Sequence, residues 1–213
     1  MLSVSSSDKI SDQGKFIIFR GNYPAEGVEG VRTQIEAIVQ QIADVFRLKH
    51  SPMLVQFIRR GDEVFVLEFS ARTGGGVKYQ MVKKASGFDV IKSVVDLTLG
   101  EHPRVGEIVA ESRFISNEFV YCAPGIFDHL EGFDDLRADG VISDYYLFKW
   151  KGAEMGVVAS SGDRICGFTI QGDTREEMSE KHNEVASRIK VIDVNGKDIM
   201  RHDLLADLYS VIM

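Results

Sequence analysis

The sequence VLEFSARTGGG, residues 66–76, places an acid, a hydroxyl and an arginine at alternate positions and then ends in three glycines. Side chains two residues apart share one face of a strand, so Glu68, Ser70 and Arg72 are expected to point the same way. A carboxylate is a magnesium ligand, and an arginine fork suits phosphate or carboxylate. The other face of the strand is uniformly apolar and is predicted to be core: Phe65, Leu67, Phe69 and Ala71.

A second predicted strand, residues 53–58, precedes this one. Gly61 and Asp62 between the two strands are typical of a hairpin turn. Such a turn places Gln56 either directly opposite Glu68 or diagonal to it, and both arrangements are within cross-strand reach. The amide oxygen and the carboxylate would then face one space, which suits Mg²⁺ with phosphates and water completing its coordination.

The glycines Gly74, Gly75 and Gly76 put backbone N–H groups beside this cluster and lead into a predicted helix at residues 77–85. Bare backbone at the start of a helix can approach an anion closely. The residues alone leave two plainer alternatives open, an exposed ion pair on the strand and an ordinary glycine-rich loop.

The elements around the hairpin indicate an α+β protein: an antiparallel sheet with packed helices, followed by a smaller β-rich, lid-like subdomain. A boundary is predicted near residue 104, which gives domains at residues 1–104 and 105–213. Apolar periodicity and turn residues predict helices at 31–48, 77–85, 88–99 and 174–190, and strands at 16–20, 53–58, 63–71, 108–115, 118–122, 141–150 and 165–170.

The composition excludes several classes of protein. A formal net charge of -7 argues against nucleic acid as the main partner. No signal peptide or apolar run long enough for a membrane is visible, so a cytoplasmic location is expected. Cys122 and Cys166 are predicted to be plain buried thiols, and the five histidines lack the spacing of a zinc site.

The segment VQFIRRGDEVFVLEFSARTGGG resembles the C-terminal hairpin of the ATP-grasp superfamily, with glutamine at the first ligand position as in the carbamoyl-phosphate-synthase branch. The flanking segments KFIIFRGNYPAE and GGGVKYQMVKKASGFDVIKSVVDLTLG resemble the parts on either side of that hairpin. The motifs APG, GDTREEMSEK and VIDVNGKDIM are similar to the lid subdomain of amino-acid-ligase-type members. The resemblance implies the C-terminal half of an ATP-grasp fold followed by the lid.

The resemblance also implies roles for single residues. Gln56 and Glu68 match the ligands of the magnesium ions that accompany ATP, and Ser70 stands where the family usually has an asparagine ligand. Arg72 matches the arginine that stabilises the transferring group, and the loop from Gly74 to Gly76 would face the acceptor substrate. The implied reaction uses ATP to activate a carboxylate as an acyl-phosphate, which an amine then attacks. The sequence does not name either substrate.

Resemblance covers only the C-terminal part of the family's fold. We therefore expect either a fragment of a longer ligase or one half of a split ligase, in which an upstream ATP-grasp polypeptide supplies the phosphate-binding lysines. A non-catalytic binding module derived from such a ligase is the alternative. An exposed sheet edge near residues 1–7 favours a homodimer.

Overall fold

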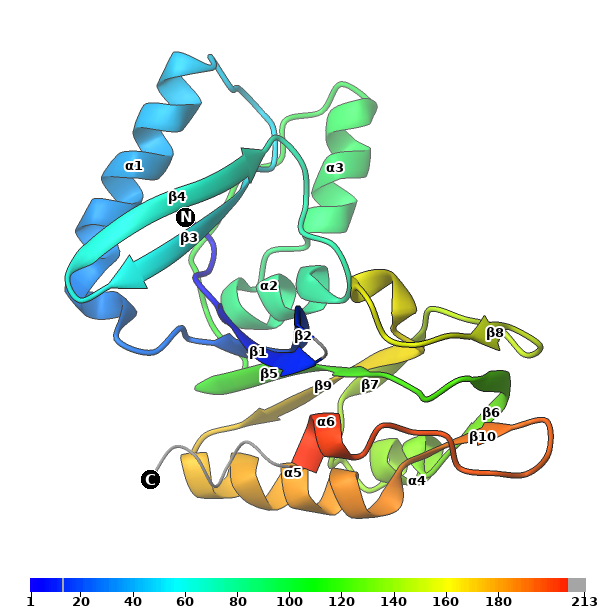
Figure 1. The fold of residues 1–213 in the computed structure, drawn as a ribbon. Coiled ribbons are helices and arrows are strands. Elements are labelled where there is room, and N and C mark those ends of the chain that lie inside the picture. Colours follow the sequence, from blue (N-terminus) through cyan, green and yellow to red (C-terminus); the bar gives the residue numbers. More distant parts are fainter. Residues whose placement is uncertain (13, 207–213) are drawn as a thin grey trace. The chain divides into compact units, whose positions relative to one another are not determined.

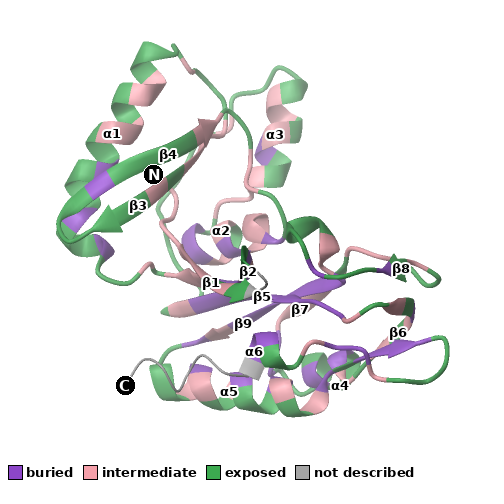
Figure 2. Ribbon diagram, in the orientation of Figure 1, coloured by how far each residue is buried: buried purple, intermediate pink, exposed green. Residues whose placement is uncertain are grey.

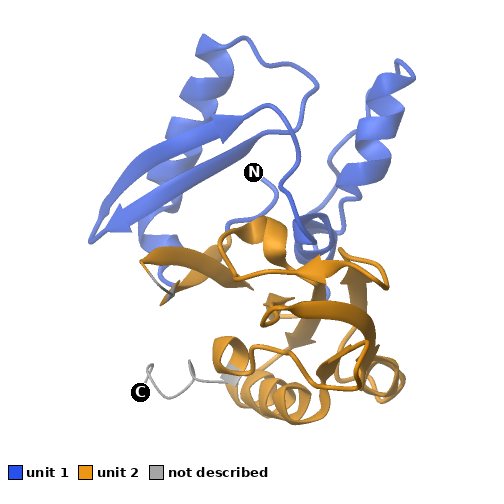
Figure 3. Ribbon diagram, turned by 45° about the vertical axis from the view of Figure 1, so that its right-hand side comes forward, with its two compact units in different colours: residues 1–4, 23–111 blue, residues 5–22, 112–213 orange. Residues whose placement is uncertain are grey.

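The computed structural model describes residues 1–12 and 14–206, which divide into two compact units (Figure 3). The first unit comprises residues 1–4 and 23–111. The second comprises residues 5–22 and continues from residue 112. The predicted division into domains 1–104 and 105–213 stays a prediction, because compactness alone does not define a functional domain.

The first unit combines helices with a two-stranded antiparallel sheet. Its elements are η1 (Val28–Val31), α1 (Arg32–Val45), β3 (Leu54–Arg60), β4 (Glu63–Ser70), α2 (Lys78–Ser86) and α3 (Val90–Thr98) (Figure 1). The three helices predicted here are confirmed. Gly87 ends α2 in the left-handed conformation at φ 69°, and the Asp89 carboxylate accepts from Lys92 N at 2.9 Å to cap α3.

The core of the first unit forms where α1 packs against the hairpin. Apolar spacing along α1 produces the stripe that the sequence predicted. The buried members of this core are Val28, Val31, Ile35 and Val64, with Ile38, Val39 and Phe57 packed against them.

One prediction for β4 is wrong. The side chain of Phe65 is 44% exposed and that of Leu67 is 54% exposed, whereas Val64 is only 9% exposed. The core side of this strand therefore includes Val64 and cannot be the uniformly apolar face that the sequence suggested.

An irregularity in the strand pairing explains the difference. Gln56 pairs with Glu68, but the next residue, Phe57, pairs with Val66, so Leu67 has no opposite residue. Such a bulge shifts the in-and-out alternation by one residue. Strict alternation, read from the sequence, cannot reveal that shift.

The second unit is built on a five-stranded sheet with strand order β1-β2-β5-β9-β7 and a three-stranded sheet with order β10-β6-β8. Its strands are β1 (Ser6–Asp12), β2 (Lys15–Tyr23), β5 (Phe114–Val120), β6 (Gly125–Glu131), β7 (Asp144–Leu147), β8 (Glu154–Met155), β9 (Cys166–Gly172) and β10 (Lys190–Asp193). Its helices are α4 (Phe133–Ala138), η2 (Ser161–Asp163), α5 (Arg175–Arg188) and α6 (Asp203–Ala206).

The larger hydrophobic core lies in this unit, between the sheets and the helices α4 and α5 (Figure 2, purple). It includes Phe127, Leu136, Phe168, Ile170, Met178, Val185 and Val191. Cys122 and Cys166 lie within it as free thiols, as predicted, and burial raises the pKa of Cys122 to about 12. No helix in the described part of the chain has the length and apolar character of a membrane span.

Strands were harder to predict in this unit. In place of two strands predicted at 108–115 and 118–122, the structure has one strand, β5, and residues 101–110 form neither helix nor strand. The polar residues Ser116 and Asn117 separate the two predicted strands, yet both are buried inside β5. Their hydrogen bonds come from distant segments, such as Thr169 Oγ1 to Asn117 Oδ1 at 3.0 Å, which no local pattern contains.

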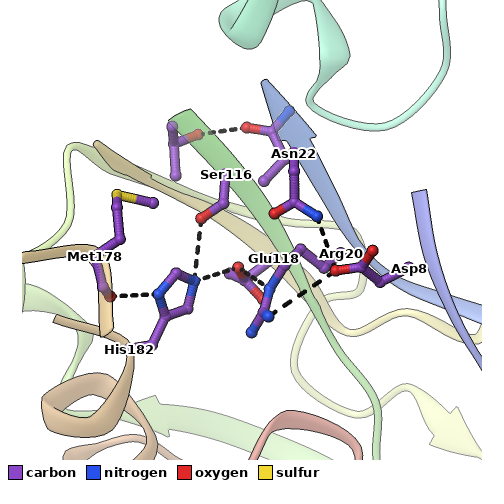
Figure 4. A network of polar contacts seen from close by, with 9 residues as sticks. Asp8, Arg20, Asn22, Ser116, Glu118, Met178 and His182 are labelled. Carbon is purple, nitrogen blue, oxygen red and sulfur yellow. Dashed lines mark hydrogen bonds and ion pairs between the residues drawn. The ribbon is translucent and has the colours of Figure 1, made fainter. Parts of the chain in front are cut away.

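A buried polar network joins four elements of the second unit (Figure 4). Glu118 Oε1 on β5 accepts from Arg20 Nε on β2 at 2.6 Å, and His182 Nε2 on α5 lies 2.6 Å from the same oxygen. Ser116 Oγ lies 3.1 Å from His182 Nε2. On the edge strand β1, Asp8 Oδ2 lies 4.0 Å from Arg20 Nη1.

The network controls the ionisation of Glu118. Burial by itself would raise the pKa of this carboxyl group, but the charges of Arg20 and His182 outweigh it and lower the pKa from 4.5 to about 2. The ion pair therefore binds the segment at residues 5–22 to the rest of the unit most firmly when Glu118 is ionised.

Replacing Glu118 by Gln should destabilise the second unit. Removing one partner of a buried ion pair costs about 3–5 kcal/mol at pH 7. Because the folded-state pKa is depressed, the stabilisation by Glu118 is present above its ordinary pKa and is lost as the pH falls from about 4.5 to 2. Urea unfolding followed by circular dichroism at pH 7 and pH 3 measures both effects.

The exposed acid Glu154 provides the control, since Glu154→Gln should unfold like the unmodified chain. Equal stability of Glu118→Gln and Glu154→Gln at both pH values would contradict the stabilising role of the network.

Candidate functional site

Gln56 and Glu68 lie directly opposite each other on β3 and β4, the cyan hairpin of Figure 1. Gln56 Nε2 donates to Glu68 Oε1 at 2.8 Å, and both side chains are exposed. Ser70 pairs with Leu54, two residues further along the same ladder, and is half-buried. Residues two apart share a face, so Glu68 and Ser70 point to the same side of the hairpin.

Arg72 lies beyond the end of β4 and is exposed. Its Nη1 donates to the carbonyl oxygen of the next residue, Thr73, at 2.8 Å. Within the described part of the chain it pairs with no carboxylate. The guanidinium is thus held by a single neutral acceptor and retains most of its donors for an anion.

The glycine loop after Arg72 includes a backbone conformation that favours glycine. Gly76 has φ 66°, in the left-handed region that side chains rarely adopt, and a Cβ at Gly75 would meet nothing within 4 Å. The loop enters α2, whose N-cap residue Val77 provides no side-chain acceptor for the first turn. The space beside Gly75 is therefore open, whereas Gly74 lies against the Lys78 side chain.

The donor set of the hairpin suits magnesium by its chemistry. Glu68 supplies a carboxylate, and Gln56 and Ser70 supply an amide and a hydroxyl oxygen, all of them hard ligands. Among residues 1–12 and 14–206, no group of three or more His, Cys, Asp or Glu side chains forms a metal cage. Mg²⁺ in proteins is usually bound by one or two carboxylates and keeps water and phosphate as its other ligands. One carboxylate with two neutral oxygens is compatible with that coordination.

Arg59, a residue to which the sequence pattern assigns no role, holds the hairpin at its turn. Its Nη1 donates to the carbonyl oxygen of Gly27 at 2.8 Å, and its Nε donates to that of Gly61 at 2.6 Å. Gly27 has φ 63°, in the left-handed region that side chains rarely adopt, and a Cβ there would lie 2.3 Å from Arg59 Nη1, so glycine is favoured at this position. In the sequence, this role is indicated only by the position of Arg59 and Arg60 directly before the turn.

Comparison with known proteins gives one family match and a set of similar structures. Residues 118–193 match the model of the L-amino acid ligase C-terminal domain 2. No curated protein matches the chain. The solved structures resemble it over most of its length, at sequence identities that establish the fold alone.

Three of these structures illustrate the similarity. Phosphoribosylglycinamide synthetase from Anaerococcus prevotii has a TM-score of 0.73 at 16% identity, over 89% of this chain and 48% of that one. The L-amino acid ligase from Bacillus licheniformis has a TM-score of 0.72 at 18% identity, over 90% and 48%. The urea amidolyase from K. lactis has a TM-score of 0.69 at 18% identity, over 92% and 12%.

The chain thus spans about half the length of the first two structures. The resemblance read from the hairpin and its flanks is confirmed at the level of the fold, since antiparallel sheets and helices follow the same arrangement in these proteins. The chain has the fold of the C-terminal part of an ATP-grasp ligase, and its residues 118–193 match a domain of L-amino acid ligases.

Proposed function

We propose that the chain is the C-terminal part of an ATP- and Mg²⁺-dependent ligase that joins a carboxylate to an amine. The observation that supports this most is the direct pairing of Gln56 with Glu68 at 2.8 Å, within the fold of ATP-grasp ligases. An amide and a carboxylate at one point of an exposed hairpin have little value for stability, so a ligand is the better reason for the pairing.

Each residue of the site has a proposed role. Gln56, Glu68 and Ser70 would hold the magnesium ion that accompanies ATP and neutralises charge on its phosphates. Arg72 would contact the transferring phosphoryl group as a catalytic residue, because its planar fork matches the oxygens of a phosphoryl or acyl-phosphate group. Gly74, Gly75 and Gly76 would line the space for the carboxylate substrate.

The proposed reaction has two steps. An oxygen of the carboxylate attacks the terminal phosphorus of ATP, the bond to the bridging oxygen breaks, and ADP leaves. The nitrogen of the amine then attacks the acyl carbon, loses a proton to solvent and expels inorganic phosphate. Arg72 stabilises negative charge in both steps, and the hairpin mainly orients the reactants.

Support for ATP comes from a similar structure. The biotin carboxylase domain of the Hydrogenobacter thermophilus 2-oxoglutarate carboxylase, with a TM-score of 0.65 and 13% identity, is described in complex with MgADP and bicarbonate. We propose that an upstream ATP-grasp polypeptide supplies the remaining contacts to the nucleotide here, whether in the same chain or as a partner.

The alternative is a non-catalytic module. One observation favours it: Gln56 and Glu68 form a hydrogen bond with each other without a metal ion. In a non-catalytic module, this pair would serve only as a cross-strand contact within the hairpin. The two functions differ in whether the hairpin binds Mg-ATP.

The first test is calorimetric titration of the chain with Mg-ATP. We expect millimolar binding, because the hairpin supplies only some of the nucleotide's contacts. Charge-assisted hydrogen bonds contribute roughly 1.5–3 kcal/mol each, so two added by an upstream polypeptide should tighten binding by about two to four powers of ten. Glu68→Gln should remove the binding, whereas the exposed Glu63→Gln on the same strand should not.

Two results would count against the ligase. Equal binding by Glu68→Gln and Glu63→Gln would show that the hairpin is not the nucleotide site. No heat at any ATP concentration, with or without the upstream polypeptide, would favour the non-catalytic module.

The second test changes the metal site itself. Gln56→Glu places two carboxylates opposite each other, which should destabilise the hairpin by about 0.2–1 kcal/mol without divalent ions. Mg²⁺ should reverse the loss and raise the melting temperature above that of the unmodified chain. Ile58→Glu, opposite Phe65, introduces the same charge without a facing acid and should show no such response. A similar effect of Mg²⁺ on both variants would contradict the proposed ligand pair.

A further inference from the structure

The second unit holds an arginine that pairs with no carboxylate among the described residues. Arg164 lies between η2 and β9 and is half-buried. Its Nε donates to Tyr121 Oη at 3.0 Å, and its Nη2 contacts the carbonyl oxygen of Ile18 at 3.3 Å. The guanidinium carbon lies 3.6 Å from the centroid of the Phe119 ring.

The side chains around Arg164 are buried and hydrogen-bonded. Phe119 and Tyr121 lie on or just after β5 and are 2% and 1% exposed. The hydroxyl of Tyr121 donates to the same carbonyl of Ile18 at 2.8 Å, so one acceptor holds both side chains. Gly167 pairs with Phe119, and a Cβ there would lie 3.3 Å from Phe119 Cδ1, so the glycine leaves the ring room to lie under the guanidinium.

The acid next to Arg164 in sequence is occupied elsewhere. Asp163 Oδ2 accepts from the backbone N–H groups of Ala159 at 2.9 Å and Ser160 at 2.8 Å, which closes the capped turn of η2. The carboxylate therefore stabilises the turn that carries Arg164 and forms no ion pair with it. In a chain with net charge -7, a half-buried arginine held only by neutral groups and a ring is unusual.

We propose that Arg164 is an anion-binding residue whose ligand is an oxyanion, either a carboxylate or a phosphoryl group. A guanidinium carries five N–H donors, and the contacts to Tyr121 and Ile18 use two of them. The remaining donors form a fixed fork, which matches the spacing of carboxylate or phosphoryl oxygens. Because the ring and the two acceptors already hold the fork, binding costs little side-chain entropy. The proposal rests on the second unit alone and is independent of the hairpin site.

The test is an NMR titration of the full chain with ¹⁵N-labelled arginine side chains, observed at the Nε–H groups. Sodium phosphate and sodium acetate are the probes, and sodium chloride at matched ionic strength is the reference. We expect a saturable shift of the Arg164 signal with at least one probe. Saturation by phosphate alone assigns a phosphoryl ligand, and saturation by acetate assigns a carboxylate.

Matched variants separate binding from general charge effects. Arg164→Lys keeps the charge and the stem but loses the fork, so it should bind the probe about tenfold more weakly, as measured on neighbouring backbone amides. Arg113→Gln removes an exposed arginine beside the Phe114 ring and should leave the titration unchanged. A linear shift equal to that with chloride, or an equal response of Arg113 and Arg164, would overturn the proposal. The titration of the unmodified chain decides this even if a variant fails to fold.

Discussion

The hydrogen bond between Gln56 and Glu68 depends on a register that two features of the hairpin fix together. The turn at Gly61 sets which residues face each other near the tip, and the unpaired Leu67 shifts the ladder by one residue before it reaches Glu68. Arg59 holds the tip by contacts to two carbonyl oxygens. A slip of one residue would turn Glu68 to the opposite face, so the chemistry of the candidate site depends on this register.

A different interaction maintains the second unit. The ion pair of Arg20 with Glu118 crosses from β2 to β5 in a fully buried place, and His182 adds a contact from α5. Residues 118–193 match a domain of L-amino acid ligases, yet the strand that bears Arg20 lies far upstream in the chain. That domain is therefore completed here by residues 5–22.

Local rules account for the parts that the sequence predicted well. The helices α1, α2, α3 and α5 follow from apolar spacing and from end signals such as Gly87 and Asp89. The hairpin itself also follows from local rules, because Gly61 and Asp62 favour a short turn, but the direct pairing of Gln56 with Glu68 needs the bulge at Leu67. The roles of Arg72 and the three glycines came from the resemblance and stay predictions.

What the sequence did not predict depends on distant contacts. The bulge at Leu67 reversed the assignment of the core face of β4. The buried polar residues of β5 looked like a break in the strand, because their partners lie on β2, β9 and α5. The strand β6 carries many polar residues and pairs with β10, a distant segment that no local pattern identifies.

Magnesium and nucleotide should meet at the hairpin, and paramagnetic broadening tests this directly. Mn²⁺ with ATP, added to the ¹⁵N-labelled chain as a substitute for Mg²⁺, broadens the amide signals nearest to the bound ion. We predict that Gln56, Glu68 and Ser70 broaden first and that Glu68→Gln abolishes the effect. Broadening that begins at other acidic positions, such as Asp134 and Asp135, and that persists in Glu68→Gln would contradict the account.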